Sequence, residues 1–273
     1  MYPALKICIY AADMDIWVSA GVRGYGGWEM GITQSIINAF AKYPRAVFLD
    51  IGANVGMHGL TVAKYGQQVY AVEPQLSTVM RLHKSVNLNG LRSKFTLIKN
   101  AVSNRRGTLR LYSDDENQGG STVVSGLVNA THRETVSTIL FDDLLEVVNS
   151  SSTDEVIIKI DIEGSEARAF TKSTKFFKQL KVRAIFMEWM TLKLFLPANR
   201  TAQPSEDAAL VLDMVARLRA AGFEPRYPDA SFEFRTHMPL DYRHMLLWPN
   251  DVVWIRPWPG IPFEGSRNRG AVV

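Results

Sequence analysis

The sequence has little cysteine, no long hydrophobic run and no block of like charges. Cys8 is the single cysteine among 273 residues, so the chain cannot form an internal disulfide, and one thiol cannot by itself build a metal site. The longest apolar stretches, such as 156–160 and 185–187, are far shorter than the roughly 18 to 20 residues that a membrane span requires. We therefore expect no contact with the membrane interior.

The overall composition is that of a soluble globular domain, with 47% hydrophobic and 21% charged residues. The net charge of +4 is mildly basic, but the basic residues are scattered, so nucleic acid is permitted as a partner and not indicated. The first residues lack the basic-then-apolar order of a signal peptide, and the sequence as written predicts a cytoplasmic location. Composition does not fix the oligomeric state.

Short apolar runs alternate with helical patterns from residue 30 onwards. This alternation is typical of a parallel sheet covered on both faces, and we predict an α/β, Rossmann-like domain. The expected strands cover residues 46–51, 68–73, 95–99, 156–162, 183–188 and 251–256, with a hairpin arm at 108–112. The expected helices cover residues 30–40, 57–65, 76–88 and 206–221.

Segments outside that alternation suggest how the chain is divided. Two short apolar runs, 6–10 and 16–20, flank a polar turn and predict an N-terminal β-hairpin. The polar stretch 113–125 predicts a loop long enough to act as a lid. The resulting division is an N-terminal hairpin and cofactor-covering segment at 1–29, the main domain at 30–256, and a surface tail at 257–273.

A glycine-bearing turn follows the strand that ends at Asp50. The dinucleotide pattern begun at Gly52 would need glycine at positions that hold Asn54 and Met57, so NAD is disfavoured. An acidic strand end attracts the ammonium group of an amino acid and would repel a pyrophosphate. S-adenosylmethionine carries that ammonium and no phosphate, and we predict it as the cofactor. Gly52 and Gly56 are expected to let the backbone pass close under it.

The next two strand ends also carry polar side chains. Glu73 follows the second strand, where a carboxylate can accept hydrogen bonds from both ribose hydroxyls, and Asn100 follows the third, facing the adenine. The alternative is that Asp50 and Glu73 are strand caps and Asn100 a turn residue. The full set of residues predicted to contact the cofactor is Glu29, Asp50, Gly52, Ala53, Asn54, Gly56, Glu73, Pro74, Asn100 and Ala101.

A second polar cluster ends the fourth strand. Period-two alternation puts Lys159, Asp161 and Glu163 on one side of an otherwise apolar run, and the following strand ends in Glu188. Charges there are costly unless they face a ligand, a metal or each other. An ion network that merely closes the sheet remains the alternative to a catalytic site.

Methyl transfer from a sulfonium to a hydroxyl requires in-line alignment and removal of the acceptor proton. A carboxylate can take that proton, either directly or by holding a divalent metal that lowers the pKa of the hydroxyl. Asp161 is our first candidate for the catalytic centre, and with Glu188 it would hold the metal if one is present. The complete set of catalytic candidates is Asp161, Glu188, Lys159, Glu163 and His58, the last from the first helix.

Four motifs together resemble the FkbM family of methyltransferases. They are FLDIGANVG at 48–56, VEP at 72–74, NLNG at 87–90 and IKIDIEGSE at 158–166. The resemblance implies a seven-stranded class I methyltransferase sheet and O-methylation, commonly of sugars or polyketide-like natural products.

The resemblance also implies roles for individual residues. It marks Asp50, Gly52, Asn54, Gly56 and Glu73 as the cofactor site, and Asp161, Glu163 and Glu166 as a signature acidic motif. Two features depart from the family pattern: His58 stands where an aromatic residue often follows the loop, and residues 114–133 form an insert. Both lie near the expected acceptor pocket.

We therefore expect a methyltransferase that modifies a hydroxyl of a sugar, a glycan or a glycosylated small molecule. One alternative is RNA ribose 2′-O-methylation, although the sequence has no evident aromatic and basic platform for bases. Another is a non-catalytic module that binds S-adenosylmethionine, which would retain Asp50 and Glu73 but would not need Asp161.

Overall fold

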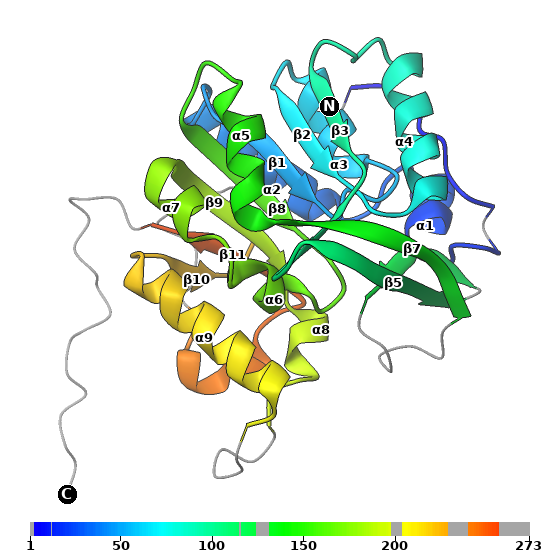
Figure 1. The fold of residues 1–273 in the computed structure, drawn as a ribbon. Helices are drawn as coiled ribbons and strands as arrows, with labels where there is room; N and C mark the ends of the chain where they lie inside the picture. Colours follow the sequence, from blue (N-terminus) through cyan, green and yellow to red (C-terminus); the bar gives the residue numbers. More distant parts are fainter. Residues whose placement is uncertain are drawn as a thin grey trace, which may run out of the picture.

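The computed structural model describes residues 3–11, 13–114, 116–123, 131–197, 204–228 and 240–256. Two sheets and their flanking helices make up this part of the chain (Figure 1). The predicted tail, 257–273, lies outside the described residues. Within the described part, no helix is long and apolar enough to cross a membrane.

The larger sheet has seven strands in the order β3-β2-β1-β8-β9-β11-β10. All pairs are parallel except those of β11, which is antiparallel to both neighbours. The predicted parallel α/β sheet is thus confirmed. The strands are β1 (Val47–Ile51), β2 (Val69–Val72), β3 (Phe95–Ile98), β8 (Glu155–Ile160), β9 (Lys181–Glu188), β10 (Glu224–Arg226) and β11 (Asp251–Ile255).

Between β1 and β8 lies the point of this sheet where the chain changes the side on which it adds strands. From β1 the chain builds outward through β2 and β3, and then returns to place β8 and β9 on the other side. Ligands of open α/β sheets bind beyond the carboxyl ends of the strands at such a switch point. The topology therefore directs attention to the residues that follow β1 and β8.

Helices cover both faces of this sheet because its central strands are apolar on both sides. All five residues of β1 are buried: Phe48 packs into one core and Leu49 into the other. The helices of the Phe48 side are α2 (Met30–Lys42), α3 (Met57–Lys64) and α4 (Leu76–Leu88). Those of the Leu49 side are α5 (Leu144–Asn149), α6 (Glu166–Phe170), α7 (Thr174–Gln179), α8 (Met190–Lys193) and α9 (Glu206–Ala220).

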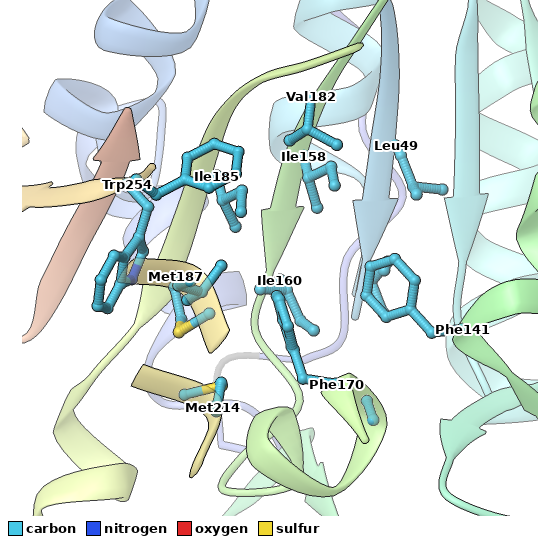
Figure 2. Close-up of a cluster of buried hydrophobic side chains, with 14 of the residues drawn as sticks. Leu49, Phe141, Ile158, Ile160, Phe170, Val182, Ile185, Met187, Met214 and Trp254 are labelled. Carbon is cyan, nitrogen blue, oxygen red and sulfur yellow. The ribbon is translucent and has the colours of Figure 1, made fainter. Parts of the chain in front are cut away.

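The core on the Leu49 side is the larger of the two. Figure 2 shows Ile158 and Ile160 of β8 beside Ile185 and Met187 of β9, with Trp254 of β11 alongside. Two short 3-10 helices, η1 (Phe141–Asp143) and η2 (Tyr242–Leu247), border this core. The burial of these aliphatic and aromatic side chains fixes the positions of the strand ends.

A second sheet of four strands stands beside the first, in the order β4-β7-β5-β6. The expected hairpin arm at 108–112 is its strand β5, but the expected loop at 113–125 contains another strand, β6. Its polar sequence predicts a loop, yet backbone pairing with β5 suffices to make it a strand. The strands are β4 (Ala101–Ser103), β5 (Gly107–Asp114), β6 (Asn117–Thr122) and β7 (Thr131–Leu140).

The predicted N-terminal β-hairpin is wrong. Residues 18–25 form helix α1 (Val18–Tyr25), because the buried Asp15 carboxylate accepts hydrogen bonds from the amides of Val18 (3.1 Å) and Ser19 (2.9 Å). The other expected strand instead lies along α4, where the Cys8 amide donates to Ser85 Oγ at 2.8 Å. A local helix cap in one segment and a contact with a distant helix in the other thus override the apolar pattern.

Candidate active site

The turn between β1 and α3 has three residues in the left-handed region: Gly52 (φ +83°), Asn54 (+51°) and Gly56 (+89°). A Cβ on Gly52 would stand 1.7 Å from the backbone oxygen of Asp161, and one on Gly56 would stand 2.2 Å from Leu82 Cδ1. We had attributed both glycines to close passage of a ligand. In the structure, contacts with the protein itself already require them.

Glu73 lies at the end of β2 with its carboxylate fixed by the backbone. One oxygen accepts from the Asn54 amide at 3.0 Å and the other from the Gln75 amide at 2.9 Å. Burial raises the pKa of Glu73 to about 7, against the lowering effect of these two amides. Each carboxylate oxygen can still accept another hydrogen bond, so the group is oriented and remains available to a ligand hydroxyl.

Asp50 does not line the cavity at the strand ends. Its side chain is fully buried, neither oxygen has a hydrogen-bond partner, and burial raises its pKa even though His58 and Lys159 lower it. Gly59 in α3 packs against it, since a Cβ there would stand 3.1 Å from Asp50 Oδ2. The structure thus does not provide the direct contact with a ligand ammonium that we predicted.

A cavity of about 590 Å³ lies at the switch point, a volume suited to a cofactor or a small substrate. All five catalytic candidates line it. So do eight of the ten cofactor candidates, the exceptions being Asp50 and Gly56. The predicted residues that line it are Glu29, Gly52, Ala53, Asn54, His58, Glu73, Pro74, Asn100, Ala101, Lys159, Asp161, Glu163 and Glu188.

Lys159 is the centre of an ion network on one wall of this cavity. Its buried Nζ lies 2.7 Å from Asp161 Oδ2 and 3.9 Å from Glu29 Oε2. Burial alone would lower the pKa of Lys159, but Asp161 and Glu29 outweigh it and raise that pKa. Burial likewise opposes ionisation of Glu29, yet Lys159 and His58 lower its pKa to about 2. The Lys159 ammonium and the Glu29 carboxylate are therefore charged together.

His58 is held in place at both ring nitrogens. Nδ1 lies 2.9 Å from Thr33 Oγ1, and Nε2 lies 3.2 Å from Glu29 Oε2. Glu29 itself has a positive φ of 48° at the start of α2. This arrangement positions Glu29 over the cavity, as we predicted for the N-terminal side, although a helix and not a hairpin precedes it.

Carboxylates gather where β8 and β9 end side by side. Glu163, in the turn after β8 with φ +52°, and Glu188 at the end of β9 both line the cavity, and Glu166 lies next to them. Burial raises the pKa of Glu163 to about 7 and that of Glu166 to about 8. Burial and the neighbouring Glu166 raise the pKa of Glu188 to about 10. The alternation of side chains along the strand correctly predicts that Lys159, Asp161 and Glu163 face the same cavity. However, β8 ends at Ile160, so Asp161 and Glu163 reach the cavity from the turn that follows the strand.

Several lining residues are not among the predicted ones. Four of them come from β6, within the segment for which the sequence predicts a loop: Asn117, Gly119, Gly120 and Ser121. Their polar, glycine-rich composition was the available signal. Asp251 begins β11 opposite Glu188, and burial raises its pKa to about 7. The available signal is that Asp251 begins its strand. The start of an antiparallel strand lies next to the end of its parallel neighbour, here β9.

The fold is that of an α/β protein whose cavity lies beyond the carboxyl ends of the parallel strands. The part of the cavity at the ends of β8 and β9 is lined by carboxylates. Residues 50–225, more than half of the chain, match the family description "Methyltransferase FkbM domain". The chain belongs to the FkbM methyltransferase family. The predicted fold class, a class I methyltransferase with a seven-stranded sheet, is confirmed.

Solved structures with a similar arrangement include other methyltransferases. The O-methyltransferase TomG from Streptomyces achromogenes, solved with SAM, is 10% identical with a TM-score of 0.43, over 82% of this chain and 78% of TomG. Precorrin-6y C5,15-methyltransferase from Geobacter metallireducens is 13% identical with a TM-score of 0.36, over 81% and 84%. Cofactor-bound Rv0187 from MTB is 9% identical with a TM-score of 0.43, over 83% and 79%. Similarity at this level identifies no substrate for this chain. A search of curated proteins found no match.

Proposed function

We propose that this chain transfers the methyl group of S-adenosylmethionine to a hydroxyl oxygen of a sugar, a glycan or a glycosylated small molecule. The observation that carries the proposal is a single cavity that joins two kinds of site. On one side, Asn54, Glu73 and Asn100 offer groups suited to a nucleoside, and on the other Lys159 and Asp161 form a charged pair.

The nucleoside side supports S-adenosylmethionine as the methyl donor. Two backbone amides orient the Glu73 carboxylate, so it can accept from the two ribose hydroxyls without reorganising. Asn100 offers an amide side chain to the adenine at the end of β3. Since Asp50 is buried behind the loop, we assign it to the electrostatics of the site and not to contact with the cofactor.

The charged pair supports an oxygen acceptor. In the proposed step, the acceptor oxygen attacks the methyl carbon in line with the breaking carbon–sulfur bond, and the acceptor proton passes to Asp161. The products are a methyl ether and S-adenosylhomocysteine. Lys159 holds Asp161 at 2.7 Å and stabilises the charge that develops on the oxygen. A divalent metal at Asp161 and Glu188 would assist by lowering the pKa of the hydroxyl.

His58 and Glu163 take supporting roles in this scheme. Because both His58 nitrogens already face partners, we assign that residue to positioning Glu29. Glu163, whose backbone oxygen accepts from Thr122 Oγ1 at 2.8 Å, ties the turn after β8 to the second sheet. This contact supports a role for β6 in shaping the acceptor side.

The charges of the cavity favour an uncharged, hydroxyl-rich acceptor over RNA. Among the described lining residues the basic side chains are Lys159 and His58, and both are already paired with carboxylates. RNA recognition relies on cations for phosphates as well as aromatic faces for bases. The described lining includes the rings of Trp17 and Trp28 but no cation beyond Lys159 and His58.

A methyl-transfer assay with Asp161→Asn tests the proposal. With labelled S-adenosylmethionine and a panel of sugar acceptors, we expect the variant to lose methyl transfer by roughly 100- to 10,000-fold, the usual contribution of a positioned base. Binding of S-adenosylmethionine, measured by calorimetry, should change little, because Asp161 follows β8 and Glu73 follows β2, with β1 between those strands. Unchanged turnover in the variant would contradict Asp161 as the base, and transfer to RNA in place of sugars would contradict the acceptor class.

A further inference from the structure

Two tryptophan rings from the N-terminal segment line the cavity. Trp17 immediately precedes α1, and Trp28 immediately precedes Glu29. Their ring centroids are 6.5 Å apart, and the ring planes are tilted by 58° to each other. Trp17 is 54% exposed although it lines the cavity, so it lies at the opening, whereas Trp28 is half-buried. Together the two rings form an aromatic surface that leads inwards from the opening, here called the tryptophan surface.

The inner ring, that of Trp28, lies next to the charged groups of the cavity. Burial raises the pKa of Glu29, but Lys159 and His58 lower it to about 2. A side-chain hydrogen bond with Trp28 has a smaller lowering effect on the same pKa, so the indole lies against this carboxylate. Glu29 in turn lies 3.9 Å from Lys159 Nζ, which is 2.7 Å from Asp161. A molecule stacked on Trp28 would therefore lie near Asp161.

The protein holds both rings in place. The Trp17 carbonyl accepts from the Gly21 amide at 2.8 Å, and the Ile16 amide donates to the Glu116 carbonyl at 3.0 Å. A Cβ on Gly21 would stand 2.8 Å from Trp28 Cε3, so α1 packs closely against the inner ring. A large aromatic side chain fixed in an exposed position leaves apolar surface in water, and a ligand that covers it gains free energy.

Aromatic rings beside many hydrogen-bonding groups are suited to a sugar. The face of an indole ring is electronegative, and the C–H groups on one side of a pyranose ring are slightly positive, so the two pack face to face. The hydroxyl groups around the pyranose need hydrogen-bond partners. Glu163, Glu188 and Asp251 offer carboxyl groups for them in the same cavity.

Two other kinds of stacking ligand fit these observations less well. Nucleobases stack on tryptophan, but the phosphates of RNA require cations, and Lys159 and His58 already face carboxylates. A flat aromatic acceptor is best enclosed between parallel rings, whereas these two are tilted by 58°. A chain of sugar rings can instead turn from one tryptophan to the next.

We propose that the tryptophan surface stacks neighbouring sugar rings of an oligosaccharide acceptor. Trp28 holds the ring that is methylated, and Trp17 holds the ring bonded to it. This order follows from their positions, because Trp28 lies by the charged pair and Trp17 at the opening. A free monosaccharide would cover only the inner ring. The methylation step rests on the proposed function, whereas binding of the oligosaccharide does not.

Calorimetry and methyl-transfer assays on the full-length protein test the tryptophan surface. The probes are trisaccharides of glucose, mannose and galactose and the methyl glycosides of the same sugars, titrated with S-adenosylhomocysteine present. We expect at least one trisaccharide to bind about tenfold more tightly than its methyl glycoside, the effect of one added aromatic contact. Trp17→Ala should abolish that difference and raise KM about tenfold with kcat nearly unchanged, because Trp17 contacts the sugar next to the reacting one.

Two further variants control for the loss of the Trp17 side chain. Trp17→Phe keeps an aromatic ring and should retain most of the trisaccharide affinity. Tyr25→Ala is the matched control, because Tyr25 is a 92% exposed aromatic residue of α1 that does not line the cavity. It should leave trisaccharide binding unchanged, and a loss equal to that of Trp17→Ala would overturn the proposal. The Trp17 side chain makes no capping hydrogen bond to α1, so we expect Trp17→Ala to fold.

The remaining outcomes separate this proposal from the proposed function. Trisaccharide binding that Trp17→Ala weakens, without methyl transfer, would keep the tryptophan surface and count against the function. Methyl transfer to sugars that Trp17→Ala leaves unchanged would keep the function and eliminate the tryptophan surface. So would a loss of S-adenosylmethionine affinity in Trp17→Ala, which would assign the ring to the cofactor. Absence of binding by every trisaccharide, or tighter binding of a uridine trinucleotide, would also overturn the proposal.

Discussion

The two halves of the cavity differ in how completely the chain satisfies its own polar groups. At the ends of β1 and β2, both oxygens of Glu73 accept hydrogen bonds from backbone amides. At the ends of β8 and β9, Glu166 and Glu188 each keep one buried oxygen without a donor. The Glu73 carboxylate is thus oriented before any ligand arrives, whereas Glu166 and Glu188 each bury one unpaired oxygen at a cost in free energy. Asp50, which lies at the end of β1 but does not line the cavity, carries the same cost, because neither of its oxygens has a partner. In the proposed function, this difference corresponds to cofactor binding at the ends of β1 and β2 and methyl transfer at the ends of β8 and β9.

Removing Glu73 is the strongest test of this comparison. Glu73→Ala should weaken S-adenosylmethionine binding roughly 30- to 100-fold, on the order of 2 to 3 kcal/mol, because two hydrogen bonds to a charged group are lost. Calorimetry measures this affinity.

Glu134→Ala is the matched control for that variant. Glu134 also accepts from a backbone amide, that of Leu76 at 2.8 Å, but it does not line the cavity. Its removal should not weaken cofactor binding; because the Glu134 charge helps to raise the pKa of Glu73, any change should be a small gain in affinity. If Glu134→Ala and Glu73→Ala weakened binding equally, the assignment of the ribose to Glu73 would be wrong.

We expect Gly56, in the turn between β1 and α3, to matter for the stability of the fold. Gly56→Ala should destabilise the fold both by its positive φ and by contact with Leu82, whereas Gly66→Ala has a similar φ of 95° and nothing within 4 Å of its Cβ. We expect Gly66→Ala to cost about 1 to 2 kcal/mol and Gly56→Ala about 1 to 3 kcal/mol more. Urea unfolding measures both, and equal losses would rule out the packing explanation.

The smallest expected effect is a pH dependence of cofactor binding. The pKa of Glu73 is raised to about 7, so its ionised fraction rises from roughly one tenth at pH 6 to roughly nine tenths at pH 8. Because the carboxylate is the form that accepts from both hydroxyls, affinity for S-adenosylmethionine should increase up to about tenfold over that range. Glu73→Gln should flatten the profile, and an affinity that instead fell with rising pH would contradict the assignment.

Much of the fold could be predicted because it is encoded locally. The expected helix at 76–88 is α4 with the same ends, and the apolar runs at 46–51 and 183–188 are the buried strands β1 and β9. Period and length suffice for such elements. The N-terminal hairpin failed since Asp15 starts a helix there, and β6 was missed because backbone pairing with β5, not side-chain pattern, makes it a strand.

The site was predicted to a similar extent and for a similar reason. Strand ends carry Glu73, Lys159, Asp161 and Glu188, and parallel strands bring their carboxyl ends to one edge, so the sequence alone determined that these residues would meet. Only the tertiary structure decided the rest. It buried Asp50 behind the loop and set Glu166 beside Glu188. Such contacts join residues far apart in the chain, and no local periodicity encodes them.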